Sequence, residues 1–172
     1  MSFLRPVDII RHLPILAGDT ILDVGSGLGA YTIELAKLSL KNKVLAIDIN
    51  RNVLDMLAYT AVTLGLSGID TIEMNIEKPW PIAPLSVDGA LLINILHATT
   101  DKDKVLQHLH QSLKPHAYAI LVDWRDVYKV GPGEKYIIKE EEAREMISRN
   151  GFKVKSDIPA GSHHYGLLLE TV

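Results

Sequence analysis

Residues 21–32 read ILDVGSGLGAYT, an apolar run that leads into a glycine-rich loop. The apolar run predicts a buried β-strand over Thr20–Val24, and the spacing of apolar residues after the loop predicts a helix over Ala30–Leu40. The loop between strand and helix holds Gly25, Ser26, Gly27 and Gly29. Glycines at such a position let a ligand come close to main-chain N–H groups at the start of a helix. The stretch therefore predicts a site for a nucleotide-like ligand at the end of the first strand.

Strand and helix patterns alternate along the rest of the chain. Helices are predicted over Pro6–Leu16, Asn52–Leu64, Asp101–Leu113 and Glu140–Asn150, and strands over Lys43–Asp48, Thr71–Met74, Val87–Ile95, Ala117–Trp124, Phe152–Ile158 and Tyr165–Thr171. Apolar runs without alternation are typical of parallel strands that are covered on both faces, and the turn at Pro159–Gly161 predicts a closing antiparallel hairpin. We therefore expect an α/β fold: a Rossmann-like three-layer sandwich whose seven-stranded sheet is mostly parallel, with an antiparallel final strand.

Composition limits the class of protein. A length of 172 residues suits one domain, so residues 1–172 are expected to form a single unit. Hydrophobic residues make up 47% of the chain, which is enough for a buried core, yet no uninterrupted run of about 18 apolar residues is present to span a membrane. The net charge of -3 gives no general attraction to nucleic acid, and the lack of cysteine excludes disulfides and thiolate chemistry. Nucleic-acid and membrane partners are not expected, and the cytoplasm is the expected compartment.

Two acidic residues help to decide which ligand fits the loop. Gly25, Gly27 and Ala30 also match the looser dinucleotide fingerprint, so the glycines alone leave an NAD(P)-binding oxidoreductase open. Asp23 precedes the first glycine by two positions, where its carboxylate would repel a pyrophosphate and attract the ammonium and sulfonium groups of S-adenosylmethionine. Asp48, at the end of the second strand, suits the ribose hydroxyls of either ligand. Asp23 thus favours S-adenosylmethionine as cofactor, although it also suits a turn in which it only accepts backbone N–H bonds.

The order of motifs resembles that of a known family. The stretches in question are DVGSGLG (23–29), VLAIDIN (44–50), MNIEKPWP (74–81), VDGALLINILHAT (87–99) and LKPHAYAILVDW (113–124). In this order they resemble the motifs of class I S-adenosylmethionine-dependent methyltransferases, over residues 18–124. Residues 140–170 are similar in layout to the last helix and hairpin of the small methyltransferase-domain subgroup, which includes quinone and small-molecule methyltransferases. The resemblance implies methyl transfer from S-adenosylmethionine to a small-molecule acceptor, with S-adenosylhomocysteine as product.

The resemblance also implies roles for residues that match the family motifs. Asp48 would hold the ribose, and Ile49 would pack against adenine. The family usually has Gly-Asp-Ala after the third strand, whereas this chain has Met74-Asn75-Ile76. The amide oxygen of Asn75 would accept the adenine amino group, a role that Glu77 is also placed to share, and the N–H of Ile76 would meet the ring. Asn94, at the end of the fourth strand, would present its carbonyl oxygen to the methionine amino group.

His97 lies just beyond the fourth strand, beside the position that the resemblance implies for the reacting methyl group. Methyl transfer from a sulfonium mainly needs an aligned donor and acceptor in a dry pocket. An acceptor with a hydroxyl or an acidic carbon must also lose a proton, and an imidazole titrates near the working pH. His97 is therefore predicted as the catalytic base, against the simpler alternative that it satisfies backbone groups near a helix start.

Other stretches narrow the chemistry. The Asn/Asp-Pro-Pro-aromatic motif of adenine and glutamine N-methyltransferases is replaced by residues 94–97, NILH, and the cysteines of arsenite methyltransferases are missing. The segment Trp124–Tyr136 suits either a lid over the acceptor or a surface connection. His163 and His164 would point to opposite faces of a strand, so no metal site is expected there. His108 is expected on the solvated face of its helix.

Three classes of function stay open on these residues. They are a methyltransferase with a small-molecule acceptor, an NAD(P)-binding oxidoreductase and a noncatalytic S-adenosylmethionine-binding module. Because little chain remains beyond the cofactor-binding part, a homodimer or a partner protein is considered as the source of the rest of an acceptor site.

Overall fold

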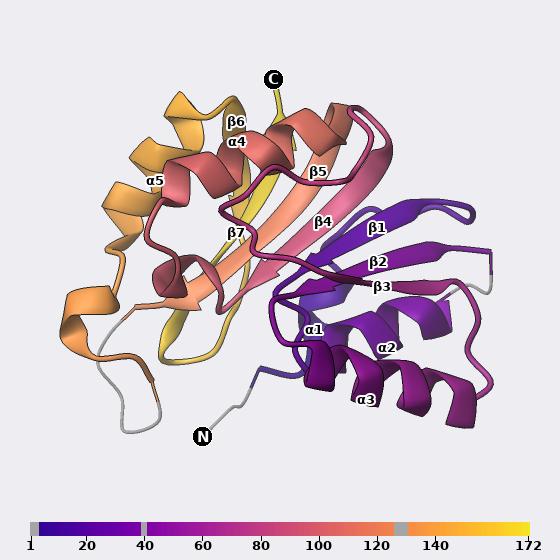
Figure 1. The fold of residues 1–172 in the computed structure, drawn as a ribbon. Coiled ribbons are helices and arrows are strands. Elements are labelled where there is room, and N and C mark those ends of the chain that lie inside the picture. The colour runs from indigo at the N-terminus through magenta and orange to yellow at the C-terminus, as the bar shows by residue number, and fades with distance from the viewer. Residues whose placement is uncertain (1–3, 39–40, 126–130) are drawn as a thin grey trace.

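A seven-stranded sheet forms the centre of the computed structural model, which describes residues 4–38, 41–125 and 131–172 (Figure 1). The strand order is β3-β2-β1-β4-β5-β7-β6. The strands are β1 (Thr20–Val24), β2 (Lys43–Asp48), β3 (Ile69–Glu73), β4 (Val87–Ile93), β5 (Leu113–Trp124), β6 (Phe152–Asp157) and β7 (His164–Thr171). Strands β1 to β5 pair in parallel, whereas β7 is antiparallel to both β5 and β6. The mostly parallel sheet with an antiparallel final strand is confirmed.

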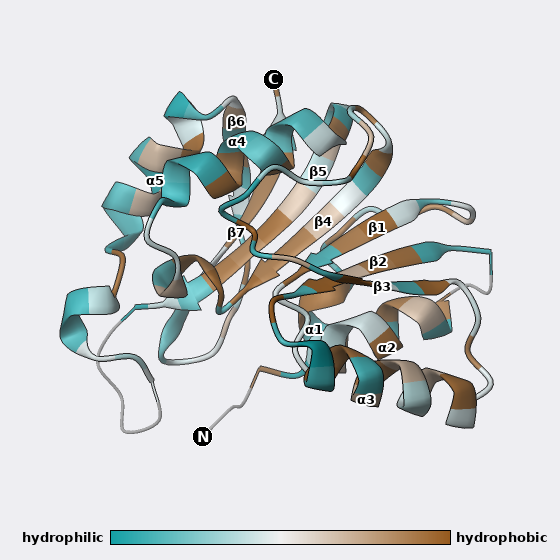
Figure 2. Ribbon diagram, viewed as in Figure 1, coloured by the Kyte–Doolittle hydropathy of each residue, from teal (hydrophilic) through white to brown (hydrophobic). Residues whose placement is uncertain are grey.

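Helices cover both faces of this sheet. One face carries α4 (Lys102–Ser112) and α5 (Glu140–Arg149), and the other carries α1 (Pro6–Ile10), α2 (Ala30–Leu38) and α3 (Arg51–Thr63) (Figure 1). Successive strand residues point into different cores: Leu121 of β5 packs on the α4 and α5 side, and its neighbour Ile120 packs on the α1 and α2 side. The strands are accordingly apolar along much of their length (Figure 2). The predicted three-layer sandwich is confirmed.

The helix boundaries show where local sequence rules applied and where they did not. Asn50 caps α3 by accepting the N–H of Asn52 at 3.0 Å, and Asp101 caps α4 by accepting the N–H of Lys104 at 3.0 Å. The prediction of a helix over Pro6–Leu16 was wrong, because α1 ends at Ile10. Pro14 disfavours helical backbone in the residue before it, so the chain leaves the helix early.

Strand β5 begins four residues earlier than predicted, directly after α4. Its pairing with β4 is irregular at the start: Val87 lies opposite Leu113, but Gly89 lies opposite Tyr118. The extra residues form a bulge that contains Pro115, which has no N–H to donate to the ladder. Pro115 is therefore accommodated in the bulge, and β5 still begins directly after α4.

The carboxyl ends of β1 to β5 meet at one edge of the sheet, and this edge positions the site. Because β7 is antiparallel, it begins at the same edge, with His164 opposite Trp124 of β5. Two short 3-10 helices lie in the connections, η1 (Leu96–Ala98) after β4 and η2 (Glu134–Tyr136) before α5. Within the described residues, no helix has both the length and the apolar character needed to cross a bilayer.

Candidate functional site

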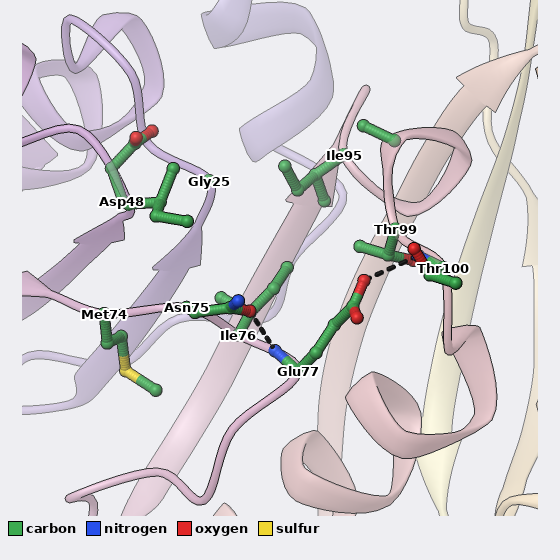
Figure 3. Close-up of a pocket in the computed structure, with 11 residues that line it drawn as sticks. Gly25, Asp48, Met74, Asn75, Ile76, Glu77, Ile95, Thr99 and Thr100 are labelled. Carbon is green, nitrogen blue, oxygen red and sulfur yellow. Dashed lines mark hydrogen bonds between the residues drawn. The ribbon is translucent and has the colours of Figure 1, made fainter.

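A cavity of about 330 Å³ opens at the carboxyl edge, between the ends of β1 and β2 and the chain that follows β4 (Figure 3). Its size lies at the lower end of the range typical of small-ligand pockets. Of the predicted cofactor residues, those in its wall are Gly25, Asp48, Ile49, Asn75 and Ile76. The other lining residues are Met74, Glu77, Ile95, Ala98, Thr99 and Thr100. The chain segments after β1, β2, β3 and β4 thus converge on one pocket.

The glycine loop is bound closely to β2. The N–H groups of Gly25 and Ser26 both donate to the carbonyl oxygen of Ile47, at 2.8 and 2.9 Å. Gly25 has a φ of 73°, and a Cβ at this position would lie 2.6 Å from the side chain of Ile95. A larger residue would therefore collide with the opposite wall of the cavity, so glycine is required here for both backbone shape and space.

The carboxylate of Asp48 stands at the bottom of the loop. One oxygen accepts the N–H of Gly27 at 2.9 Å, and the other accepts the N–H of Asn50 at 2.9 Å. Each carboxylate oxygen can accept more than one hydrogen bond. The carboxylate is thus fixed in orientation by the main chain and keeps acceptor capacity for a ligand in the cavity.

Asn75 and Ile76 occupy the turn after β3. The side-chain oxygen of Asn75 accepts the N–H of Glu77 at 2.9 Å, which fixes the orientation of the amide and leaves a second lone pair on this oxygen. Glu77 in turn accepts the N–H of Thr100 at 2.5 Å, so the chain after β3 is tied to the chain after β4 across the cavity (Figure 3). Ile49, on the rim, exposes 66% of its surface and offers an apolar face.

Asp23 and Gly29 lie behind the loop, outside the set of residues that line the cavity. The buried carboxylate of Asp23 accepts the hydroxyl of Thr32 at 2.6 Å, and burial raises the pKa of this carboxyl to about 6, against the opposing effect of that bond. A Cβ at Gly29 would lie 2.2 Å from a methyl group of Leu57. Gly29 therefore allows close packing of α2 against α3, and both residues support the loop from the α2 side.

Three buried polar atoms of the described chain have no hydrogen-bond partner near the loop: the hydroxyls of Ser26 and Tyr31 and the side-chain oxygen of Asn94. Val24 and Leu92 are register partners on adjacent strands, so Ser26 and Asn94, each two residues further on, leave the same edge. Burial, and then the charge of Asp23, raises the pKa of Tyr31 to about 12, so its hydroxyl stays a proton donor. Hydroxyl groups can donate to the carboxylate of an amino-acid moiety, and an amide oxygen can accept from its ammonium group. These three atoms therefore have the hydrogen-bonding capacity to bind such a moiety.

His97, in η1, is bound to Asp123 at the end of β5. The distance from Nδ1 of His97 to one carboxylate oxygen is 2.7 Å, and the main-chain N–H of His97 donates to the other at 2.9 Å. The N–H of Trp124 also donates to this carboxylate, at 2.8 Å. Asp123 is 1% exposed. A buried carboxylate on Nδ1 fixes the ring so that Nε2 carries the free lone pair at neutral charge.

Sequence reasoning missed Asp123. One signal was available, because Asp123 is a polar residue at the carboxyl end of an otherwise apolar strand, as Asp23 and Asp48 are. Its partner His97 is 26 residues away, and the two meet only because β4 and β5 are neighbours in the sheet.

Other predicted features have mixed outcomes. The expectation of a solvated His108 was wrong: its ring is part-buried, packs against Trp80 with centroids 5.7 Å apart, and reaches the carbonyl oxygen of Ile76 at 3.3 Å. His164 packs on Trp124 with ring centroids 4.2 Å apart. Part of the segment Trp124–Tyr136, for which a lid and a surface connection were both considered, lies outside the described residues, namely 126–130. Over the part of the chain that is described, no group of three or more His, Asp or Glu is placed to hold a metal ion.

Comparison with known proteins identifies the family of this chain. Residues 15–164 match the family described as a methyltransferase domain. A crystal structure of a SAM-dependent methyltransferase from Aquifex aeolicus is similar with a TM-score of 0.89 and 26% identity, over 99% of this chain and 91% of that one. The demethylmenaquinone methyltransferase of Lactobacillus johnsonii is 24% identical in an alignment 192 residues long. This alignment covers 91% of this chain and 79% of that protein.

Another relative aligns with this chain over only part of its own length. The ubiquinone/menaquinone biosynthesis C-methyltransferase of Escherichia coli O1:K1 is 28% identical over 109 residues. The alignment covers 62% of this chain and 43% of the relative, so the match spans less than half of that protein.

Proposed function

This chain belongs to the methyltransferase-domain family and is a class I S-adenosylmethionine-dependent methyltransferase, and we propose that its acceptor is a small molecule from which His97 removes a proton. The observation that carries the proposal is the pair formed by His97 and the buried Asp123, with 2.7 Å between nitrogen and oxygen. The pair stands at the same edge as the cofactor cavity.

We assign the donor site as follows. Asp48 accepts the ribose hydroxyls, and Ile49 covers one face of the adenine. Asn75 and the N–H of Ile76 meet the purine edge. The main-chain groups of the Gly25–Gly27 loop, with the hydroxyl of Ser26, line the path of the methionine part. The side-chain oxygen of Asn94 receives the ammonium group, in place of the main-chain carbonyl oxygen expected from the sequence, because this side-chain atom has no hydrogen-bond partner among the described residues.

The bound donor supplies a methyl group on a sulfonium, which is already an activated leaving group. The task of the chain is then to align the acceptor with the methyl–sulfur bond and to keep water out. The acceptor's lone pair forms the new bond to carbon, and the electrons of the broken bond stay on sulfur as a thioether. No protein atom needs to form a covalent intermediate.

The acceptor proton goes to Nε2 of His97. Asp123 holds the proton on Nδ1 and stabilises the imidazolium that forms when Nε2 accepts a second proton. The imidazolium then releases its proton to water, and the cycle closes with neutral His97. Two relatives are named for methyl transfer in quinone biosynthesis. A ring carbon activated by a neighbouring phenol hydroxyl suits these names, one of which is a C-methyltransferase, and the proton that such an acceptor loses is the one that His97 accepts.

The proposal is tested with His97→Asn and a panel of phenols and hydroquinones, with production of S-adenosylhomocysteine as readout. We expect kcat to fall by about 100-fold or more, and affinity for S-adenosylhomocysteine to stay within about twofold. His116→Asn is the matched control, because His116 is exposed, lies at the opposite edge of the sheet and has a φ of 59° that Asn tolerates. Unchanged turnover in His97→Asn would exclude His97 as the base.

A further inference from the structure

Two aromatic rings bind the outer side of the turn that forms the adenine end of the cavity. The indole N–H of Trp80 donates to the carbonyl oxygen of Ile76 at 2.8 Å, and Nδ1 of His108, on α4, lies 3.3 Å from the same oxygen. The two rings also pack on each other, with centroids 5.7 Å apart and planes inclined at 49°. Both lone pairs of one loop carbonyl are thus occupied by side chains 4 and 32 residues away.

Fixing this carbonyl fixes the orientation of a cavity side chain. The peptide unit is planar, so holding the oxygen of Ile76 also sets the direction of the next N–H, which belongs to Glu77. That N–H donates to the side-chain oxygen of Asn75 at 2.9 Å. Trp80 and His108 hold the carbonyl oxygen of the peptide between Ile76 and Glu77. The N–H of the same peptide therefore sets the orientation of the Asn75 amide.

Besides the two rings, the turn is held by the hydrogen bond from Thr100 to Glu77 and by the buried side chain of Ile76. Residues 74–84 form no helix or strand, and Asn75 is exposed. A hollow of about 250 Å³ lies on the far side of the turn, lined by Pro79, Trp80, His108 and Gln111 among others. Without the two rings, the turn has space to move away from the cavity into this hollow.

We propose that Trp80 and His108 are positioning residues for the donor's purine ring. They hold the peptide between Ile76 and Glu77, and through the N–H of Glu77 the Asn75 amide, so that this amide faces adenine and selects it over purines with other edge groups. The inference rests on the donor site assigned under the proposed function, since it concerns the purine end of that site.

The test compares two ligands that differ only at the purine edge. Calorimetry measures the affinities of S-adenosylhomocysteine and of S-inosylhomocysteine, in which an exocyclic carbonyl oxygen replaces the adenine amino group and the adjacent ring nitrogen carries a hydrogen. Trp80→Phe keeps an aromatic ring but has no N–H, and His108→Phe does the same on the other side. Tyr59→Phe, on the exposed face of α3, is the matched control for removal of one aromatic polar group. Thermal unfolding of the ligand-free variants accompanies each measurement.

We expect the native protein to prefer the adenosine ligand, and each of the two variants to lower that preference by about 5-fold, the effect of one net hydrogen bond. The double variant should lower it further, and Tyr59→Phe should leave it unchanged. A variant that weakens both ligands equally has only a structural effect and would overturn the inference, as would an unchanged preference. Native protein that binds neither ligand would instead overturn the donor site itself, so the two failures are distinguishable.

Discussion

The proposed donor half and the proposed acceptor half of the site are built in different ways. At the ends of β1 and β2, main-chain hydrogen bonds fix the shape of the site: the N–H groups of the Gly25–Gly27 loop donate to the carbonyl oxygen of Ile47 and to the carboxylate of Asp48. At the ends of β4 and β5, a single pair of side chains, His97 and Asp123, carries the proposed chemistry. The donor half is therefore specified by backbone shape, and the acceptor half by two residues that the sheet brings together.

The largest effect is expected in the acceptor half, for Asp123→Asn. The amide would present an N–H group to a histidine that needs an acceptor on Nδ1, so the imidazole would take the wrong tautomer or turn away. We expect kcat to fall by about 100- to 10,000-fold, with affinity for S-adenosylhomocysteine nearly unchanged. Single-turnover kinetics and calorimetry measure the two quantities separately. Loss of donor binding in this variant would show that the two halves are not independent.

The converse experiment is made in the donor half, with Asp48→Ala. The variant loses the proposed ribose contacts and the acceptor for the N–H groups of Gly27 and Asn50. Hydrogen bonds to a charged group contribute about 1.5 to 3 kcal/mol each, so we expect affinity for S-adenosylhomocysteine to fall by about 100-fold or more. Calorimetry measures this, with Asp55→Ala as control because Asp55 is an exposed residue of α3. A fall of less than about tenfold would contradict the assignment of Asp48 to the ribose.

A smaller effect is expected behind the donor loop, for Asp23→Asn, and it depends on pH. Burial raises the pKa of Asp23 to about 6 from 3.8, so between these values the unfolded chain is ionised while the folded chain keeps the proton. The contribution of this carboxyl group to the free energy of unfolding is therefore complete below about pH 4 and is lost as the pH rises to about 6. The Asp23→Asn variant has no ionisable group at this position, so it lacks this pH dependence.

Urea unfolding of both proteins at several pH values measures that difference. We expect the stability of Asp23→Asn relative to the native protein to rise by up to about 3 kcal/mol between pH 4 and pH 7, and to stay constant above that. The other carboxylates are shared by both proteins, so their contributions cancel in the difference. A difference that does not change with pH would show that the pKa of Asp23 is not raised.

The contrast between the two halves also explains which parts of the fold and the site could be predicted from the sequence. The positions of Gly25 and Asp48 in the cavity wall were predictable because both residues fall in short stretches whose chemistry is local. The layers and the antiparallel last strand also followed from local patterns of apolar residues and turns. Asp48, Asn75 and Ile76 were expected at the cavity and are found in its wall.

Contacts between distant segments were not predictable in this way. Asp123 meets His97 only after β4 and β5 pair, and the turn near Ile76 covers His108 only after β3 and α4 take their places. A helical periodicity reports which face of α4 is apolar, and gives no sign that a loop from elsewhere packs beside that face. The motif also did not distinguish residues that line the cavity from those behind it, as Asp23 and Gly29 show.

The reversed direction of β7 has a practical consequence for handling the protein. The strand begins at the edge that carries the site, at His164, and runs away from it, so Val172 emerges at the opposite edge beside Gly151 (Figure 1). Val172 is 69% exposed. A linker attached there would tether the molecule to a sensor chip or a resin with the cavity facing the solution. Ligand binding to immobilised protein should therefore match binding in free solution.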